Sequence, residues 1–143
     1  MVFAFAGLQR RVVWVGFFGA AIAGVSMAQG PTKNLRVELS EARRLLENKQ
    51  ALVFDIREPH EHATGVAPGA RLLPMSQLNK RVLEIPKDPK QPVLVICNTQ
   101  NRSSRVVQAM VEAGWTNVRY VHGGMSTWVA NGWPVVKPPS PSP

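Results

Sequence analysis

The sequence is poor in cysteine, in aromatic residues and in negative charge. Cys97 is the single cysteine among 143 residues, which excludes an internal disulfide and any zinc or iron–sulfur site built from several cysteine ligands. Aromatic residues make up 7% of the chain, and 17 Lys and Arg outnumber nine Asp and Glu, so the net charge is +8. This balance favours small anions or an acidic partner. Because the charges are scattered and not gathered beside aromatic residues, we expect no nucleic-acid partner.

Hydrophobic residues, in contrast, make up 45% of the chain, which is enough to build a core. The length corresponds to one ordinary domain, which we expect to occupy residues 33–136. Residues 137–143 include four prolines, which exclude a helix or a central strand. We expect this segment to be a disordered tail rich in Pro and Ser.

Residues 1–28 are predicted to be a signal peptide. Arg10 and Arg11 precede the apolar run 12–25, and small residues follow up to a cleavage site after Ala28. Cleavage there would leave 15 Lys and Arg against nine Asp and Glu, a net charge of +6. The folded domain is therefore expected in a bacterial periplasm.

Two alternatives for this segment stay open. An uncleaved helix would anchor the domain to the membrane facing the periplasm. A span needs about 20 apolar residues, and the run reaches that length only if Gln29, Gly30 and Pro31 are included. The pair of arginines also permits a twin-arginine export signal. Membrane contact is expected only if the segment stays uncleaved.

The rest of the chain alternates short apolar strands with helices. Strands are expected at residues 35–37, 52–56, 71–73, 93–97 and 118–121, and helices at 41–48, 75–85, 102–113 and 125–131. The run 93–97 is apolar without alternation, as in a strand that is buried on both faces. This pattern predicts a three-layer α/β domain with a five-stranded, mainly parallel sheet. Ligands bind such sheets at the carboxyl ends of strands, where Asp55 and Cys97 are expected.

The segment around Cys97 carries the clearest chemical signal. Cys97 ends a buried strand, and Arg102 opens the next helix after only four intervening residues. A loop this short must curl, so its backbone N–H groups converge in front of the helix N-terminus and form an anion site. That environment favours the ionised thiolate, which is the nucleophilic form of cysteine. A buried and inert structural cysteine is the alternative.

Several motifs share one order with a known family. They are Phe54–Glu61, with Asp, Arg and Glu at positions 55, 57 and 61; the turn Gly65–Ala70; the loop Cys97–Ser103; and the closing segments Gly123–Trp128 and Gly132–Val135. Together they resemble the single-domain rhodaneses, a family of sulfurtransferases. The resemblance spans residues 35–135.

The resemblance implies a chemistry and a set of site residues. Cys97 would carry sulfane sulfur as a persulfide, taken from a small anionic donor such as thiosulfate and passed to a thiol, cyanide or a protein cysteine. Arg102 would hold the loop and add charge, and no cofactor or metal would be needed. The residues expected to bind the substrate are Asn98, Thr99, Gln100, Asn101, Ser103 and Arg57.

Details of the loop bear on the alternatives. Phosphatases and arsenate reductases that resemble this architecture have one more residue between Cys and Arg, so the shorter loop favours sulfur transfer. Gln100 stands where the family often has glycine, which predicts a left-handed residue at a cost of about 1 kcal/mol. Asn98 replaces a usual cation, which predicts a less positive pocket. A rhodanese-like module that binds an anion or a partner without turnover stays open.

The other ionisable residues are expected to play structural roles. Asp55 is predicted to accept hydrogen bonds from loop amides or from Arg57, and Glu61 to be a structural partner. His60 and His62 stand two residues apart, but no further ligand has a fixed spacing, so we expect no metal site.

Overall fold

A computed structural model describes residues 34–138 of the chain. The predicted signal peptide at residues 1–28 and residues 139–143 of the predicted tail lie outside the described residues. The strands are β1 (Arg36–Val37), β2 (Leu52–Asp55), β3 (Arg71–Leu72), β4 (Val93–Ile96) and β5 (Val118–Val121). They form a five-stranded sheet in the order β1-β5-β4-β2-β3, in which every pair of neighbours is parallel. The predicted parallel α/β sheet is confirmed.

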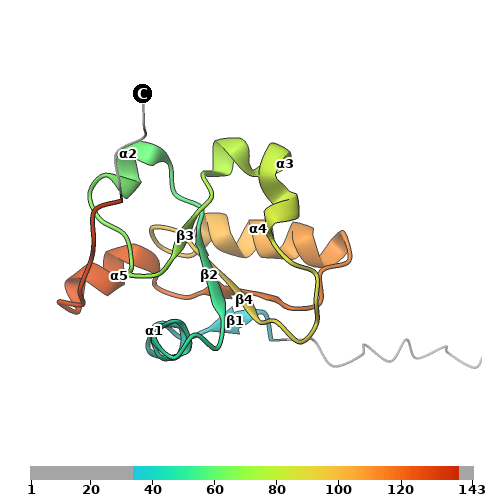
Figure 1. Ribbon diagram of the computed structural model, residues 1–143, viewed down its shortest axis with the longest axis horizontal. Helices are drawn as coiled ribbons and strands as arrows, with labels where there is room; N and C mark the ends of the chain where they lie inside the picture. Colours follow the sequence, from blue (N-terminus) through green and yellow to red (C-terminus); the bar gives the residue numbers. More distant parts are fainter. Residues whose placement is uncertain (1–33, 139–143) are drawn as a thin grey trace, which may run out of the picture. The chain divides into compact units, whose positions relative to one another are not determined.

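Helices cover both faces of this sheet. They are α1 (Leu39–Glu47), α2 (Pro59–His62), α3 (Leu78–Arg81), α4 (Asn101–Glu112) and α5 (Gly124–Ala130), and two 3-10 turns, η1 (Met75–Gln77) and η2 (Val82–Glu84), flank α3. Figure 1 shows α1 and α5 on one side of the strands and α3 and α4 on the other. None of the helices within residues 34–138 has the length and apolar character that a membrane crossing requires.

The central strand β4 divides the core into two clusters. Val93 and Val95 pack with α4 and Trp115, whereas Leu94 and Ile96 pack with α1 and α5. All four residues of the strand are buried, as the uninterrupted apolar run predicts. Cys97 continues the alternation and lies in the cluster on the α4 side.

Two segments differ from the expectation. The helix expected at residues 75–85 is a single α-helical turn between two 3-10 turns. The short helix α2 was not expected, because its four residues carry no apolar periodicity. A capping box between Glu58 and Glu61 and a proline at the first turn, Pro59, hold it instead.

The register brings the ends of β2 and β4 together. Asp55 pairs with Ile96, and the Ile56 amide donates to the Ile96 carbonyl oxygen at 3.0 Å. The segments that follow these strands, α2 and the loop after Cys97, therefore meet at the carboxyl edge of the sheet. The candidate site lies at this edge, where parallel α/β sheets bind ligands.

Candidate active site

Cys97 lies directly after β4, and its side chain is enclosed by the residues that follow it. The residue is 1% exposed. Its Sγ accepts a hydrogen bond from the Ser103 amide at 3.4 Å, and its thiol donates to the Ser103 Oγ at 3.4 Å. The Ser103 hydroxyl donates in turn to the Gln100 carbonyl oxygen at 3.2 Å. Ser103 thus links the sulfur atom to the loop from the first turn of α4.

The start of α5 holds the loop from outside. The amides of Met125 and Ser126 donate to the carbonyl oxygens of Cys97 and Asn98, each at 2.9 Å. In a trans peptide the next N–H points opposite to the carbonyl, so the amides of Asn98 and Thr99 are turned away from α5. Within residues 34–138, the amides of residues 98–102 have no hydrogen-bond acceptor. Five donors at the N-terminus of a 12-residue helix are thus available to an anion.

Gly124 permits the close contact between α5 and the loop. Its φ is +59°, and a Cβ there would lie against the carbonyl oxygen of Thr99 and 2.5 Å from that of Cys97. These atoms belong to the backbone, so they have no flexible end that could move aside. The preceding Gly123 amide donates to the Gln100 Oε1 at 3.3 Å. This role of α5 was not predicted from the sequence, although the Gly-Gly doublet at the start of the helix is a signal for it.

Arg102 ties the loop to α2. Its two terminal nitrogens donate to the two carboxylate oxygens of Glu61, each at 2.7 Å. The Arg102 guanidinium lowers the pKa of Glu61 to about 2, and Glu61 raises the pKa of Arg102 in turn. Glu61 also accepts from the Glu58 amide at 2.9 Å. The predicted structural role of Glu61 therefore has a specific partner, a bidentate arginine 41 residues away in sequence.

Arg57 is bound within the fold. It is 4% exposed, and its guanidinium donates to Asp55 with a shortest distance of 2.7 Å. It also donates to the carbonyl oxygens of Glu61 at 3.3 Å and Gly65 at 2.8 Å. The nitrogens of Arg57 thus bind acceptors of the fold beneath the surface, and the expected role of Arg57 in donor binding stays a prediction. Asp55 accepts from the amide and the guanidinium of Arg57, as predicted.

The two histidines of the same segment lie apart. His60 is exposed, whereas His62 is 3% exposed with its Nε2 3.4 Å from Asp55 Oδ1. That contact is not a hydrogen bond, and the His62 Nε2 has no other partner within residues 34–138. No cluster of three His, Cys, Asp or Glu side chains suited to a metal ion occurs in this described part of the chain.

The remaining loop residues are more exposed than Cys97. Asn98, Thr99 and Asn101 are exposed, and Gln100 is half-buried. Gln100 has φ −151°, so the predicted left-handed strain is absent and that expectation is wrong. The loop turns without a positive φ because its carbonyls are held by α5. Fold and site together define a parallel α/β domain with a cysteine at the start of a loop whose amides lack an acceptor within residues 34–138.

Comparisons with known proteins agree with this class. A family model described as "Rhodanese-like domain" matches residues 38–131. A sulfurtransferase from Allochromatium vinosum is 35% identical over 99 residues, which cover 69% of this chain and 91% of that protein. The thiosulfate sulfurtransferase GlpE from Pseudoalteromonas translucida is 26% identical, with coverage of 66% and 88%. The chain belongs to the rhodanese-like domain family.

Solved structures show the same fold. A rhodanese-related protein from Thermoplasma volcanium has a TM-score of 0.61 and 32% identity, and the match covers 72% of this chain and 98% of that one. The human single-domain sulfurtransferase TSTD1 has a TM-score of 0.56 and 27% identity, with coverage of 67% and 96%. A Rhodopseudomonas palustris protein described as a possible tyrosine phosphatase is 19% identical, which shows the fold alone. The family and these relatives support a rhodanese-type sulfurtransferase activity.

Proposed function

We propose that this protein transfers sulfane sulfur through a persulfide on Cys97. The donor is a small molecule that carries sulfane sulfur, such as thiosulfate, and the acceptor is a thiol, cyanide or a protein cysteine. The observation that carries the proposal is the setting of the single cysteine. Its Sγ lies beside Ser103, at the start of a loop whose five amides lack an acceptor within residues 34–138.

This geometry fits both half-reactions. In the first, the Cys97 thiolate attacks the outer sulfur of the donor, and sulfite leaves if the donor is thiosulfate. The loop amides then donate to the terminal sulfur of the anionic persulfide, as donors in an oxyanion hole do for oxygen. In the second, the acceptor removes that sulfur and restores the thiolate. Arg102 acts as a positioning residue, because Glu61 binds both of its terminal nitrogens.

Mass spectrometry of the intact protein tests the proposal. Incubation with a sulfane sulfur donor should add about 32 Da, the mass of one sulfur atom, and cyanide should remove it. The Cys97→Ser variant should gain no mass under the same conditions. The proposal fails if the wild-type protein stays unmodified by every donor while its circular dichroism shows an intact fold.

A module that binds without turnover is the second candidate. The observation in its favour is the 1% exposure of Cys97, since a donor reaches Sγ only if the loop moves. This candidate predicts that iodoacetamide leaves the native thiol unmodified. It also predicts that thiosulfate changes the amide resonances of residues 98–102 without adding mass.

Phosphatase or arsenate reductase activity ranks below both candidates. Four residues separate Cys97 from Arg102, and a tetrahedral oxyanion needs a wider ring of amides. Hydrolysis of a generic aryl phosphate is the measurement that separates this activity from sulfur transfer. We expect no hydrolysis above the level of the Cys97→Ser variant.

We also propose that the protein acts in the periplasm. The support is the order of charged, apolar and small residues at positions 10–28, which is typical of a cleaved export signal. N-terminal sequencing of the protein from a periplasmic extract should begin at Gln29. Retention of Met1 on a membrane-bound form would favour the uncleaved anchor instead.

A further inference from the structure

The cationic side chains around the loop are bound by carboxylates. Arg102 is bound by Glu61, and Arg57 by Asp55. A third carboxylate, Glu58, adds to the raised pKa of Arg102 and accepts hydrogen bonds from Ser76. Two guanidiniums therefore face three carboxylates at this edge of the sheet.

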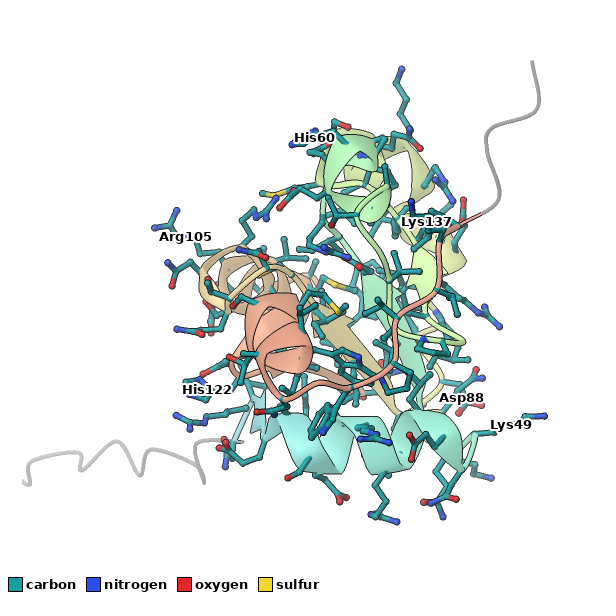
Figure 2. The ribbon with its side chains drawn as sticks, turned by 90° about the vertical axis from the view of Figure 1, so that its left-hand side faces the viewer. Lys49, His60, Asp88, Arg105, His122 and Lys137 are labelled. Carbon is teal, nitrogen blue, oxygen red and sulfur yellow. The ribbon has the colours of Figure 1, made fainter. Side chains whose placement is uncertain are left out.

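The next cation along α4 does not change this balance. Arg105 is one turn beyond Arg102 and is exposed, and Figure 2 shows its side chain directed away from the ribbon. An exposed charge that points into water is screened and contributes little at the sulfur atom. Attraction for an anion in the loop therefore comes mainly from the amides of residues 98–102 and the α4 N-terminus, equivalent to roughly half a charge, beside a smaller electrostatic interaction between Arg102 and Cys97.

The charge of the reacting groups depends strongly on the donor. With thiosulfate, the thiolate and the dianion bring three negative charges. The bond from the Cys97 Sγ to the outer sulfur forms, the S–S bond of thiosulfate breaks, and sulfite leaves with two charges. With the neutral form of an organic persulfide, RSSH, which is the electrophilic form, the thiolate brings the only charge. The new S–S bond forms, the old one breaks, and the RSSH proton leaves on the product RSH.

On the basis of the proposed sulfurtransferase function, we propose that the physiological donor is an organic persulfide and that thiosulfate is a poor donor. A site without an uncompensated cation stabilises one negative charge with its amides but not three. Asn98 is exposed and directly follows Cys97, so it is the position at which an added cation tests this preference.

Rates of Cys97 persulfidation test this inference. Three donors are compared: thiosulfate with two charges, methanethiosulfonate with one, and hydroxyethyl persulfide. Each rate is measured in wild-type protein, in Asn98→Lys and in a control with the same added charge, Asn48→Lys. Asn48 is exposed at the end of α1, next to Lys49, which Figure 2 places at the end of the domain opposite His60. Each variant rate is divided by the wild-type rate with the same donor, so differences in intrinsic reactivity among the donors cancel.

We expect Asn98→Lys to raise the thiosulfate rate by about 10-fold at low salt, with a smaller gain for methanethiosulfonate and the smallest for the persulfide. Added salt should remove these gains. Asn48→Lys should leave all three rates near the wild-type values.

Equal gains for the three donors would overturn the inference. So would a wild-type thiosulfate rate that matches the persulfide rate. In both cases the proposed function stands, because sulfur still reaches Cys97. If none of the donors modifies Cys97 in the wild-type protein, the sulfurtransferase function itself fails.

Discussion

Ser103 is the residue in closest polar contact with the sulfur atom. Its amide and its hydroxyl both lie 3.4 Å from Sγ, and the residue is fully buried. Once Cys97 is ionised, the hydroxyl can donate to the sulfur instead of to Gln100. We therefore expect the Ser103 hydroxyl to stabilise the Cys97 thiolate. If the hydroxyl is removed, the Ser103 amide still donates to the sulfur.

Ser103→Ala should slow alkylation of Cys97 by iodoacetamide by about 3- to 10-fold, the usual worth of one hydrogen bond. The unfolding free energy should fall by about 1 kcal/mol. Ser104→Ala removes a hydroxyl that donates only to the Asn101 carbonyl and is the matched control. Equal alkylation rates in the two variants would contradict a role of Ser103 at the sulfur.

Gly124 and Gly132 have similar backbone conformations but different surroundings. Comparing their alanine variants distinguishes the cost of a left-handed residue from the cost of a steric clash. Gly124 and Gly132 have φ of +59° and +67°, but an added Cβ at Gly132 meets no atom within 4 Å. Gly132→Ala should therefore cost only the left-handed conformation, about 1 kcal/mol. Gly124→Ala should cost more, and because it displaces the Cys97 carbonyl, it should also reduce persulfide formation. Urea unfolding and mass spectrometry measure the two effects, and similar losses in both variants would contradict the contact.

At the scale of elements, the Glu61–Arg102 pair fastens α2 to α4. The pKa of Glu61 falls from 4.5 to about 2 on folding, so its carboxylate stabilises the fold above pH 4.5. That contribution is lost as the pH falls from 4.5 towards 2, where the folded protein takes up the proton. The cause is the bidentate Arg102, which favours the ionised form.

Glu61→Gln should therefore be less stable than wild type at about pH 7, and the difference should shrink below about pH 4.5. Urea unfolding at a series of pH values measures this difference. Glu112→Gln is the control, since Glu112 accepts a hydrogen bond from the neutral Gln108. A Glu61→Gln difference that stays constant down to the lowest pH would contradict the assigned pairing.

Elements with a strong apolar pattern were predictable from the sequence. The run that forms β4 has four buried residues and could only be a central strand, and β5 occupies the expected residues. The helix α2 was not predictable, because its stability comes from a capping box and not from periodicity. The shape of the loop was also missed, since Met125 and Ser126 hold it from a distant part of the chain.

At the scale of the whole domain, one sheet is shared by two cores. Trp115 belongs to the cluster on the α4 side and Trp128 to the cluster on the α1 and α5 side. Strand β4 contributes alternate residues to both, so neither cluster can be disrupted without exposing the other face of the same strand. Such coupling is typical of all-or-none unfolding.

Two variants in a Trp14→Phe background separate the clusters: Trp115→Phe reports from Trp128 and Trp133, and Trp128→Phe combined with Trp133→Phe reports from Trp115. Both should unfold in single transitions whose fluorescence midpoints match those from circular dichroism. Each midpoint is compared within one variant, so a change in stability does not affect the test. Separate fluorescence and circular dichroism midpoints in either variant would show that the two faces unfold independently.

The contact between α5 and the loop has a consequence for how the protein matures. A ribosome delivers Cys97 well before Gly124, Met125 and Ser126, the residues that hold its loop. Until α5 has formed and docked, the carbonyls of the loop lack the hydrogen bonds from Met125 and Ser126 that orient the amides after Cys97. We therefore expect an incomplete chain to lack this reactivity and the protein to acquire it only once α5 has docked on the loop.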